Sequence, residues 1–329
     1  MSKRKVEWLP KNRILRRTVY GLWLATPALA LTSCGPSDPR DQFHDCGWWQ
    51  ERTRETEEIA LGENEPLPAH PACDPCPPAG QWAEILKGCE SKAVPGKNAY
   101  RLVCAYDWCD PHDGRRPEGL QAAPPPEAGC LLGAFTAQVA WLEAASVPAF
   151  LRLADELTAH GAPELLVKAA RRSAGDEVRH TRVMKEFAGR HGARMPEVEL
   201  PPFEPRSLEA LLTENAIEGC VRETYGALVA GWQARHAGNA ELRRVMRPIA
   251  RDELRHAELA WAVDAWGAGR LTPEERARLR QARGETLLAL EREVDRQPPP
   301  EPLIREAGLP SREQALSLLP GLAELIAQA

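Results

Sequence analysis

The sequence has little that favours binding to nucleic acid or a span across a membrane. It carries 42 basic against 47 acidic residues, a formal net charge of −5, so it lacks the positive excess on which nucleic-acid binding depends. The apolar stretch at 19–31 is too short to cross a bilayer as a helix. Histidine is also scarce, with 8 in 329 residues. Because histidines are few, a repeated motif that contains one is informative.

The most informative motif occurs twice. Asp-Glu-Val-Arg-His at 176–180 recurs as Asp-Glu-Leu-Arg-His at 252–256. Glu and His three residues apart lie about one turn from each other on the same face of a helix, where both can bind one metal ion. A single acid-x-x-His is expected by chance, and Asp41-Gln-Phe-His44 is such a case. Two copies of the longer motif, each within an apolar helical pattern, indicate a site.

The repeat extends upstream of each motif. Glu143 precedes Glu177 by 34 residues, and Glu218 precedes Glu253 by 35. Each of the two upstream glutamates is followed seven residues later by an aromatic residue. This regularity predicts a duplicated helix hairpin.

The apolar spacing predicts four helices, at about 131–160, 163–192, 207–238 and 240–266. Four prolines in 195–205 exclude a helix between the second and the third. Two short connections make antiparallel neighbours, and the long middle connection can cross the bundle. The predicted fold is therefore all-α, with a four-helix bundle and one long crossover in 130–267.

The glutamates of the repeat lie on apolar helix faces. Glu143, for example, shares its face with Val139, Val147 and Phe150. An unpaired buried carboxylate costs several kcal/mol, and here four would converge. Two divalent cations would balance four glutamates with two neutral imidazoles, and such oxygen-rich ligation suits iron or manganese. The alternative is a protonated, hydrogen-bonded polar core without metal.

The aspartate and arginine of each motif fit supporting roles. A metal-bound histidine usually donates its other ring N–H to a carboxylate. Asp176 and Asp252 are each expected to serve the histidine of the other copy, and Arg179 and Arg255 to balance their charge.

With these motifs, residues 130–267 resemble the ferritin-like di-iron carboxylate superfamily. The Asp-Glu-x-Arg-His form is similar to that of bacterial multicomponent monooxygenases and ribonucleotide reductase small subunits. The segments that begin at Glu143 and Asp252 also resemble ferritin-like envelope lipoproteins of soil and predatory bacteria. The resemblance implies two ions. Either Glu177 and Glu253, or the two upstream glutamates Glu143 and Glu218, would bridge them. One ion would be held by Glu143, Glu177 and His180, and the other by Glu218, Glu253 and His256. Glu214 and Glu223 are open as further ligands.

The resemblance also implies redox chemistry with dioxygen or peroxide. No second Cys-x-x-Cys pair follows the bundle, so electrons would come from an external donor. Two alternatives are metal sequestration without turnover and a structural envelope protein whose metal cross-links the helices.

The N-terminal segment 1–33 is typical of an export signal. Seven basic residues precede the apolar stretch, and Leu31-Thr-Ser-Cys34-Gly35 resembles a bacterial lipobox, which implies lipidation of Cys34. Gly35, in place of an aspartate, favours anchoring at the outer membrane, facing the periplasm. A signal anchor with an incidental cysteine is the alternative, and Arg16-Arg17 resembles a twin-arginine signal weakly. Removing 1–33, with seven basic residues and one acidic residue, changes the net charge from −5 to −11.

The segment 34–129 is rich in proline and cysteine. In an exported chain such density predicts a small region stapled by disulfides. Zinc binding by Cys73, Cys76, Cys104 and Cys109, with His112 near, is the alternative.

The segment 268–329 is expected to add helices. Thr272-Pro-Glu-Glu275 is a capping box for a helix to about Arg296. Ser311-Arg-Glu-Gln314 opens a last amphipathic helix, which Pro320 is expected to interrupt.

Overall fold

The computed structural model describes residues 12–23, 49–62, 66–69, 71–76, 84–109, 115–120, 126, 128–296 and 298–327. The chain divides into two compact units, one of residues 37–111 and one of 1–36 together with 112–329. Each is described by itself below. Most of the described chain is helical, as predicted, and its helices belong to the larger unit.

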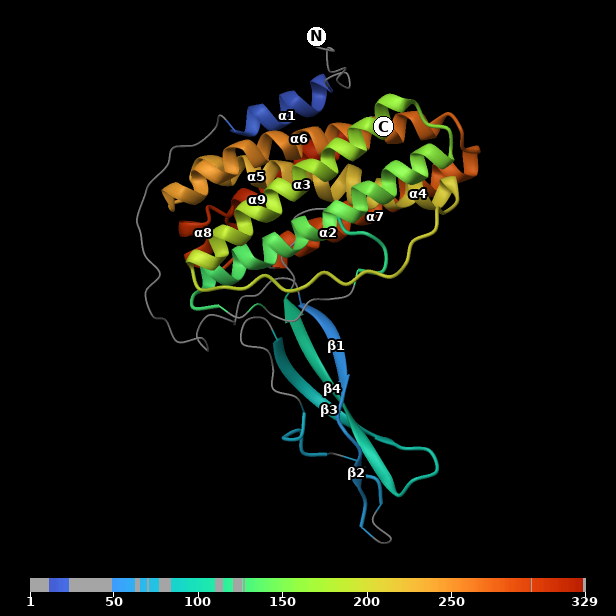
Figure 1. The fold of residues 1–329 in the computed structure, drawn as a ribbon, viewed down its shortest axis with the longest axis vertical. Coiled ribbons are helices and arrows are strands. Elements are labelled where there is room, and N and C mark those ends of the chain that lie inside the picture. Colours follow the sequence, from blue (N-terminus) through green and yellow to red (C-terminus); the bar gives the residue numbers. More distant parts are fainter. Residues whose placement is uncertain are drawn as a thin grey trace, which may run out of the picture. The chain divides into compact units, whose positions relative to one another are not determined.

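The larger unit is built on four long helical stretches (Figure 1). The first two are α2 (Leu131–Ala159) and α3 (Glu164–Arg190). The third is an unbroken run of α4 (Leu208–Glu214), the π-helix η2 (Asn215–Glu223) and α5 (Thr224–His236). The fourth is α6 (Ala240–Ala268). Helix α2 packs on α3, α6 packs on α5 and η2, and α3 packs on α6. The predicted helix ends lie within a few residues of these.

The connections follow from local chemistry. Gly161, at φ +67°, turns the chain between α2 and α3, a conformation that favours glycine. The Asn239 side chain caps α6, accepting from the backbone N–H groups of Glu241 and Leu242 at 3.0 Å each. Ser207 Oγ accepts from Ala210 N at 3.2 Å and begins α4. The longer connection 191–207 contains no helix.

The apolar core of this unit has two layers, and the same three helices contribute to both. One layer contains apolar residues from the part of α2 that begins at Phe150, from the part of α3 that ends at Ala174, and from the part of α6 that begins at Leu259. The other layer contains apolar residues from the part of α2 that ends at Ala140, from the part of α3 that begins at Met184, and from the part of α6 that ends at Ala250. The segments 141–149, 175–183 and 251–258 thus lie between the layers, and they contain Glu143 and both motif copies.

Three further helices complete this end of the chain: α7 (Pro273–Arg296), α8 (Glu301–Glu306) and α9 (Arg312–Ala327). The capping box before α7 is present, since Thr272 N donates to Glu275 Oε2 at 2.7 Å and Glu275 N to Thr272 Oγ1 at 3.2 Å. The expected interruption of the last helix is wrong. Helix α9 continues through Pro320, because the lost hydrogen bond is offset by buried leucines on both sides of it, among them Leu319 and Leu322.

Helix α1 (Arg13–Trp23) packs against α5 and α9. Its Arg16 makes a two-pronged ion pair with the buried carboxylate of Glu258 on α6, at 2.6 and 2.9 Å. Among the described residues, none of the helices combines the length and apolarity needed to cross a membrane. Cys34, the predicted lipidation site, lies outside the described residues.

The smaller unit adds to the mostly helical structure a four-stranded antiparallel sheet that the sequence did not predict. The strands are β1 (Trp49–Glu55), β2 (Ile59–Ala60), β3 (Glu84–Ala93) and β4 (Ala99–Cys109). Strand β4 pairs with all three others. Glu55 of β1 lies opposite Val103 of β4, and Cys89 of β3 lies opposite Cys104 of β4. Polar residues dominate β1, so its sequence does not show the alternation typical of a half-buried strand.

Two disulfides staple this sheet. Cys73 is bonded to Cys89 and Cys76 to Cys104. The small core around them contains Leu102, which is fully buried. The disulfides confirm the expected oxidised state for these four cysteines and leave no thiolates among them for the alternative zinc site. Cys46 and the side chains of Cys109 and His112 lie outside what the structure describes.

Candidate metal centre

Four buried side chains converge between the two apolar layers. Glu143 comes from α2, Glu177 and His180 from α3, and Glu253 from α6. One ligand atom of each lies within 4.8 Å of those of the other three. Three carboxylates and an imidazole at this spacing could hold a metal ion.

The two histidines share two of the glutamates. His180 Nδ1 lies 3.5 Å from one oxygen of Glu177, and His256 Nδ1 lies 3.0 Å from the other. Glu253 does the same, with its oxygens 3.2 Å from His180 Nδ1 and 3.5 Å from His256 Nδ1. Glu143 contacts only the first histidine of the pair, at 3.3 Å from His180 Nδ1. The geometry therefore has two halves, and Glu177 and Glu253 lie between them.

The far side of each imidazole meets the aspartate of the other motif copy. His180 Nε2 lies 3.1 Å from Asp252 Oδ2, and His256 Nε2 lies 3.4 Å from Asp176 Oδ2. A carboxylate at Nε2 holds a proton on that nitrogen and turns Nδ1 toward the glutamates. This crossed arrangement agrees with the expectation for the two aspartates from the sequence.

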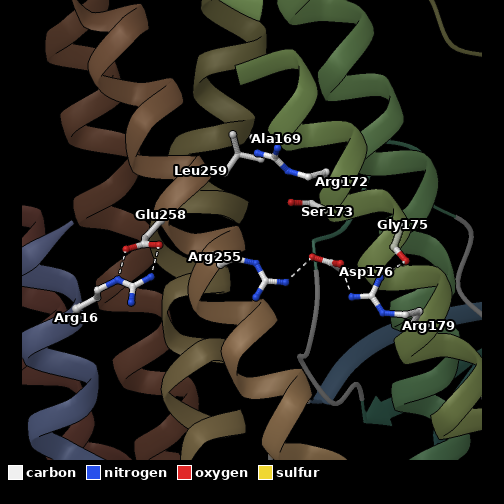
Figure 2. A pocket seen from close by; sticks show the side chains of 10 residues that line it. All are labelled: Arg16, Ala169, Arg172, Ser173, Gly175, Asp176, Arg179, Arg255, Glu258 and Leu259. Atoms are coloured by element: carbon white, nitrogen blue, oxygen red, sulfur yellow. Dashed lines mark hydrogen bonds and ion pairs between the residues drawn. The ribbon is translucent and has the colours of Figure 1, made fainter. Parts of the chain in front are cut away.

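Arg179 and Arg255 join the two aspartates into a closed ring of charges. Arg255 Nη2 lies 3.0 Å from Asp176 and 2.5 Å from Asp252, and Arg179 contacts both aspartates as well, at 3.1 Å from Asp252. Figure 2 shows Arg255 and Arg179 on either side of Asp176. Asp176, Arg179 and Arg255 line a pocket of about 700 Å³. The ring neutralises both aspartates and fixes both histidine rings.

Two glutamates of the third helical stretch, Glu218 and Glu223, have different surroundings. Glu218 lies outside the cluster, where its carboxylate accepts from Arg116 N at 3.4 Å and lies 3.9 Å from Arg222 Nε. Glu223 is almost fully buried, and its Oε2 has no hydrogen-bond partner among the described residues. Burial raises the pKa of Glu223 to about 8, and the nearby carboxylates of Glu253 and Glu177 contribute to this. Glu223 therefore lies near enough to the cluster to feel its charge, although neither Glu223 nor Glu218 is one of the four residues whose ligand atoms converge.

Both glutamates lie in the π-helix, which alters how side chains are spaced along the helix. Between Asn215 and Glu223 the helix is wider than an α-helix, so positions five apart replace positions four apart as neighbours along one side. Asn215 Nδ2 donates to the Ala260 carbonyl of α6 at 2.9 Å, which fixes this segment against its neighbour. Repeat spacing assumes a uniform helix, so it placed the ligand near 218. The only signal for Glu223 in the sequence was that it was one of three glutamates on this helix.

Glu214, the other candidate for a further ligand, is occupied elsewhere. Its carboxylate lies 2.7 Å from Arg206 and 3.7 Å from the fully buried Arg115. Arg206 also pairs with Glu156 at 2.8 Å. Glu214 thus belongs to a separate ion-pair network.

Several buried polar atoms at this site have no hydrogen-bond partner among the described residues, and they fit the requirements of a bound metal ion. Buried polar atoms nearly always have a hydrogen-bond partner. Among the buried side-chain atoms that have none are one atom from each of the four residues of the cluster, and one each from the neighbouring His256 and Glu223: Glu143 Oε2, Glu177 Oε2, His180 Nδ1, Glu253 Oε1, His256 Nδ1 and Glu223 Oε2. Both histidines use Nε2 for aspartate and leave Nδ1 without a hydrogen bond. These atoms are hard and intermediate donors, of the kind that bind iron, manganese or zinc.

The protonation of the cluster is linked across its members. Burial, followed by the charge of Glu177, raises the pKa of Glu143 well above its usual range. Burial acts to lower the pKa of His256, but Glu253, Glu177 and Asp176 outweigh it and raise that pKa. The protein alone therefore keeps protons within the cluster. Metal ions of positive charge would displace those protons.

Comparison with protein-family models, with curated proteins and with solved structures finds no match to this chain. The assignment of the site therefore depends on its own geometry and on the motifs in the sequence.

Proposed function

We propose that this protein is a ferritin-like protein that holds a dinuclear centre of iron, or of iron and manganese. In this proposal Glu143, Glu177 and His180 hold one ion, while Glu223, Glu253 and His256 hold the other. Glu177 and Glu253, each of which lies within 3.5 Å of both histidines, would help to hold both ions. The observation that carries the proposal is the set of six buried donor atoms without hydrogen-bond partners.

The order of the donors along the chain supports the ferritin-like assignment. One glutamate comes from each of the first and third helical stretches, and a Glu-x-x-His pair comes from each of the second and fourth. This is the ligand pattern of di-iron and di-manganese carboxylate bundles. The long connection between α3 and α4 corresponds to the single crossover of such bundles.

The centre's proposed activity is redox chemistry with dioxygen or peroxide. A bound metal pair supplies the site at which an oxidant binds and is reduced. The chain's own residues orient the imidazoles through Asp176 and Asp252, balance charge through Arg179 and Arg255, and exclude water through the apolar layers. In this proposal the electrons come from an external donor.

The protein's place in the cell is proposed from the sequence. The basic segment, the apolar stretch and Cys34 favour export and a lipid anchor at the outer membrane, with the bundle in the periplasm. The two disulfides support an oxidising compartment.

Metal analysis of the purified protein tests the proposal. We expect about two ions per chain, and losses in Glu177→Ala and Glu253→Ala. Wild-type protein without bound metal, under conditions where both iron and manganese are supplied, would contradict it. Folding of each variant is checked by circular dichroism.

A second function is metal sequestration or cross-linking without turnover. The enclosed position of the cluster between two apolar layers favours it, since such a site limits access to a substrate. Consumption of dioxygen or peroxide by the iron-loaded protein with an artificial reductant distinguishes the two. Turnover supports redox chemistry, and stable binding without turnover supports the second function.

A further inference from the structure

A second pocket, of about 490 Å³, lies between α5 and α6 and is lined by arginines without carboxylates. Its lining residues are Gly231, Ala234, Arg235, Arg247, Ala250 and Arg251. The first three come from α5 and the last three from α6. This arginine pocket shares none of its lining residues with the metal cluster or with the pocket in Figure 2.

The pocket arises from a similar spacing on both helices. Gly231, Ala234 and Arg235 have the spacing i, i+3, i+4, and so do Arg247, Ala250 and Arg251. Residues with this spacing lie on one helix face. Small residues therefore form the floor where the helices meet, and the longer guanidinium side chains form the rim.

The three arginines have no acidic partner in the described part of the chain. Arg235 is half-buried, Arg247 and Arg251 are exposed, and none of them forms an ion pair there. The acidic residues that flank Arg247 and Arg251 in the sequence of α6 are engaged elsewhere. Glu241 pairs with Arg190 at 2.5 Å, and Asp252 lies against His180 and Arg179.

Three positive charges around one cavity repel one another, and cations four apart on a helix destabilise it. A bound anion would remove that repulsion. The planar guanidinium group matches phosphate oxygens with two parallel hydrogen bonds. The small-residue floor leaves room for an apolar or neutral group attached to the phosphate.

We propose that the arginine pocket binds a phosphate group, either of a free phosphate compound or of a lipid headgroup. Arg247 and Arg251 hold the phosphate oxygens from α6, and Arg235 does so from α5. The site is independent of the proposed metal function.

The test compares Arg247→Gln/Arg251→Gln with a control that removes the same charge. The control is Arg280→Gln/Arg292→Gln on α7, where both side chains are exposed. Binding of inorganic phosphate to the full chain is measured by calorimetry. Binding to phosphatidylcholine vesicles with and without phosphatidic acid is measured by sedimentation. The double variant leaves every proposed metal ligand unchanged, so phosphate bound at the metal would survive it.

We expect wild-type protein and the control to bind with the same affinity. We expect the affinity of the pocket variant to be lower by about tenfold or more. Loss of affinity for inorganic phosphate identifies a free phosphate as the ligand. Loss confined to phosphatidic acid vesicles identifies a lipid headgroup. The proposal is overturned if wild-type protein binds neither probe, if the pocket variant binds both as wild type does, or if the control loses as much affinity.

Discussion

Glu218 and Glu223 differ in their surroundings, and this difference gives the first prediction. Glu218 accepts a backbone hydrogen bond and lies near Arg222, whereas Glu223 has a buried oxygen without a hydrogen-bond partner. We expect Glu223→Gln to lower the metal content or the metal affinity, and Glu218→Gln to leave both close to wild type. Metal analysis after dialysis at a fixed free metal concentration measures the effect. The opposite ranking would show that the ligand is Glu218.

The raised pKa of Glu223 predicts the pH dependence of the metal-free protein. The folded pKa is about 8 against 4.5 for an ordinary glutamate, so the folded state keeps a proton that the unfolded chain releases in this window. The contribution of Glu223 to stability is present below the unfolded pKa and lost as pH rises through the folded one. We expect chelated wild-type protein to be less stable at about pH 8 than at about pH 5, and Glu223→Gln to show a smaller loss.

Urea unfolding at the two pH values measures this. His180 and His256 have raised pKa values and contribute in the same direction above the ordinary histidine range, so only the difference between wild type and variant reports on Glu223. Equal losses in both proteins would contradict the assignment.

The contact between Asp252 and His180 gives a prediction about metal affinity, because Asp252 would act on the metal only through the histidine. Its carboxylate lies 3.1 Å from His180 Nε2. We expect Asp252→Asn to weaken metal binding by about 10- to 100-fold, because the imidazole loses its orientation and basicity. Asp155→Asn, an exposed change on α2, is the matched control and should bind as wild type does. An unchanged affinity in Asp252→Asn would show that the contact has no role in the site.

At the residue scale, the sequence was sufficient to predict most of the cluster. Glu177 with His180 and Glu253 with His256 could be predicted because residues three apart on any α-helix share a face. Asp176 and Asp252 could be predicted from the chemistry of imidazole. Glu223 could be named only as one of several candidate ligands, because its position depends on a π-helix that packing against α6 stabilises.

At the scale of elements, the π-helix packs closely against α6. A Cβ at Gly219 would lie 2.7 Å from Ala260 Cβ and 2.9 Å from Asn215 Oδ1, whereas one at Gly226 in α5 would meet no atom within 4 Å. We expect Gly219→Ala to destabilise the protein by about 1–3 kcal/mol, since α6 and η2 must separate. Gly226→Ala should be neutral or stabilise by about 0.5 kcal/mol. Chemical unfolding of both variants checks this, and equal stabilities would contradict it.

The helices could be predicted more completely than the strands. Apolar spacing and caps such as Thr272 and Ser311 define the helices locally. The strands of 49–109 have a small core and depend on partners distant in sequence and on two disulfides, so their pattern is weak. Pro320 was misjudged for a related reason. Long-range packing of α9 outweighs the local cost of one proline.

At the scale of the molecule, the two units are stabilised by different chemistry. The helical unit has the candidate metal cluster, and the sheet has the disulfides. We expect a chelator to lower the melting temperature of the helical signal in circular dichroism, and a reductant without metal affinity to leave that transition and the metal content nearly unchanged. If the reductant lowered the helical transition as much as the chelator, the two units would depend on each other.

The crossed pairing of each aspartate with the histidine of the other repeat has a consequence for evolution. Neither repeat is self-sufficient, since Asp176 serves His256 and Asp252 serves His180. After a duplication, redundant copies usually diverge, but here a change in one copy damages the half of the site that belongs to the other. Selection would therefore preserve both five-residue motifs together, and substitutions should covary between the copies more strongly than within either one.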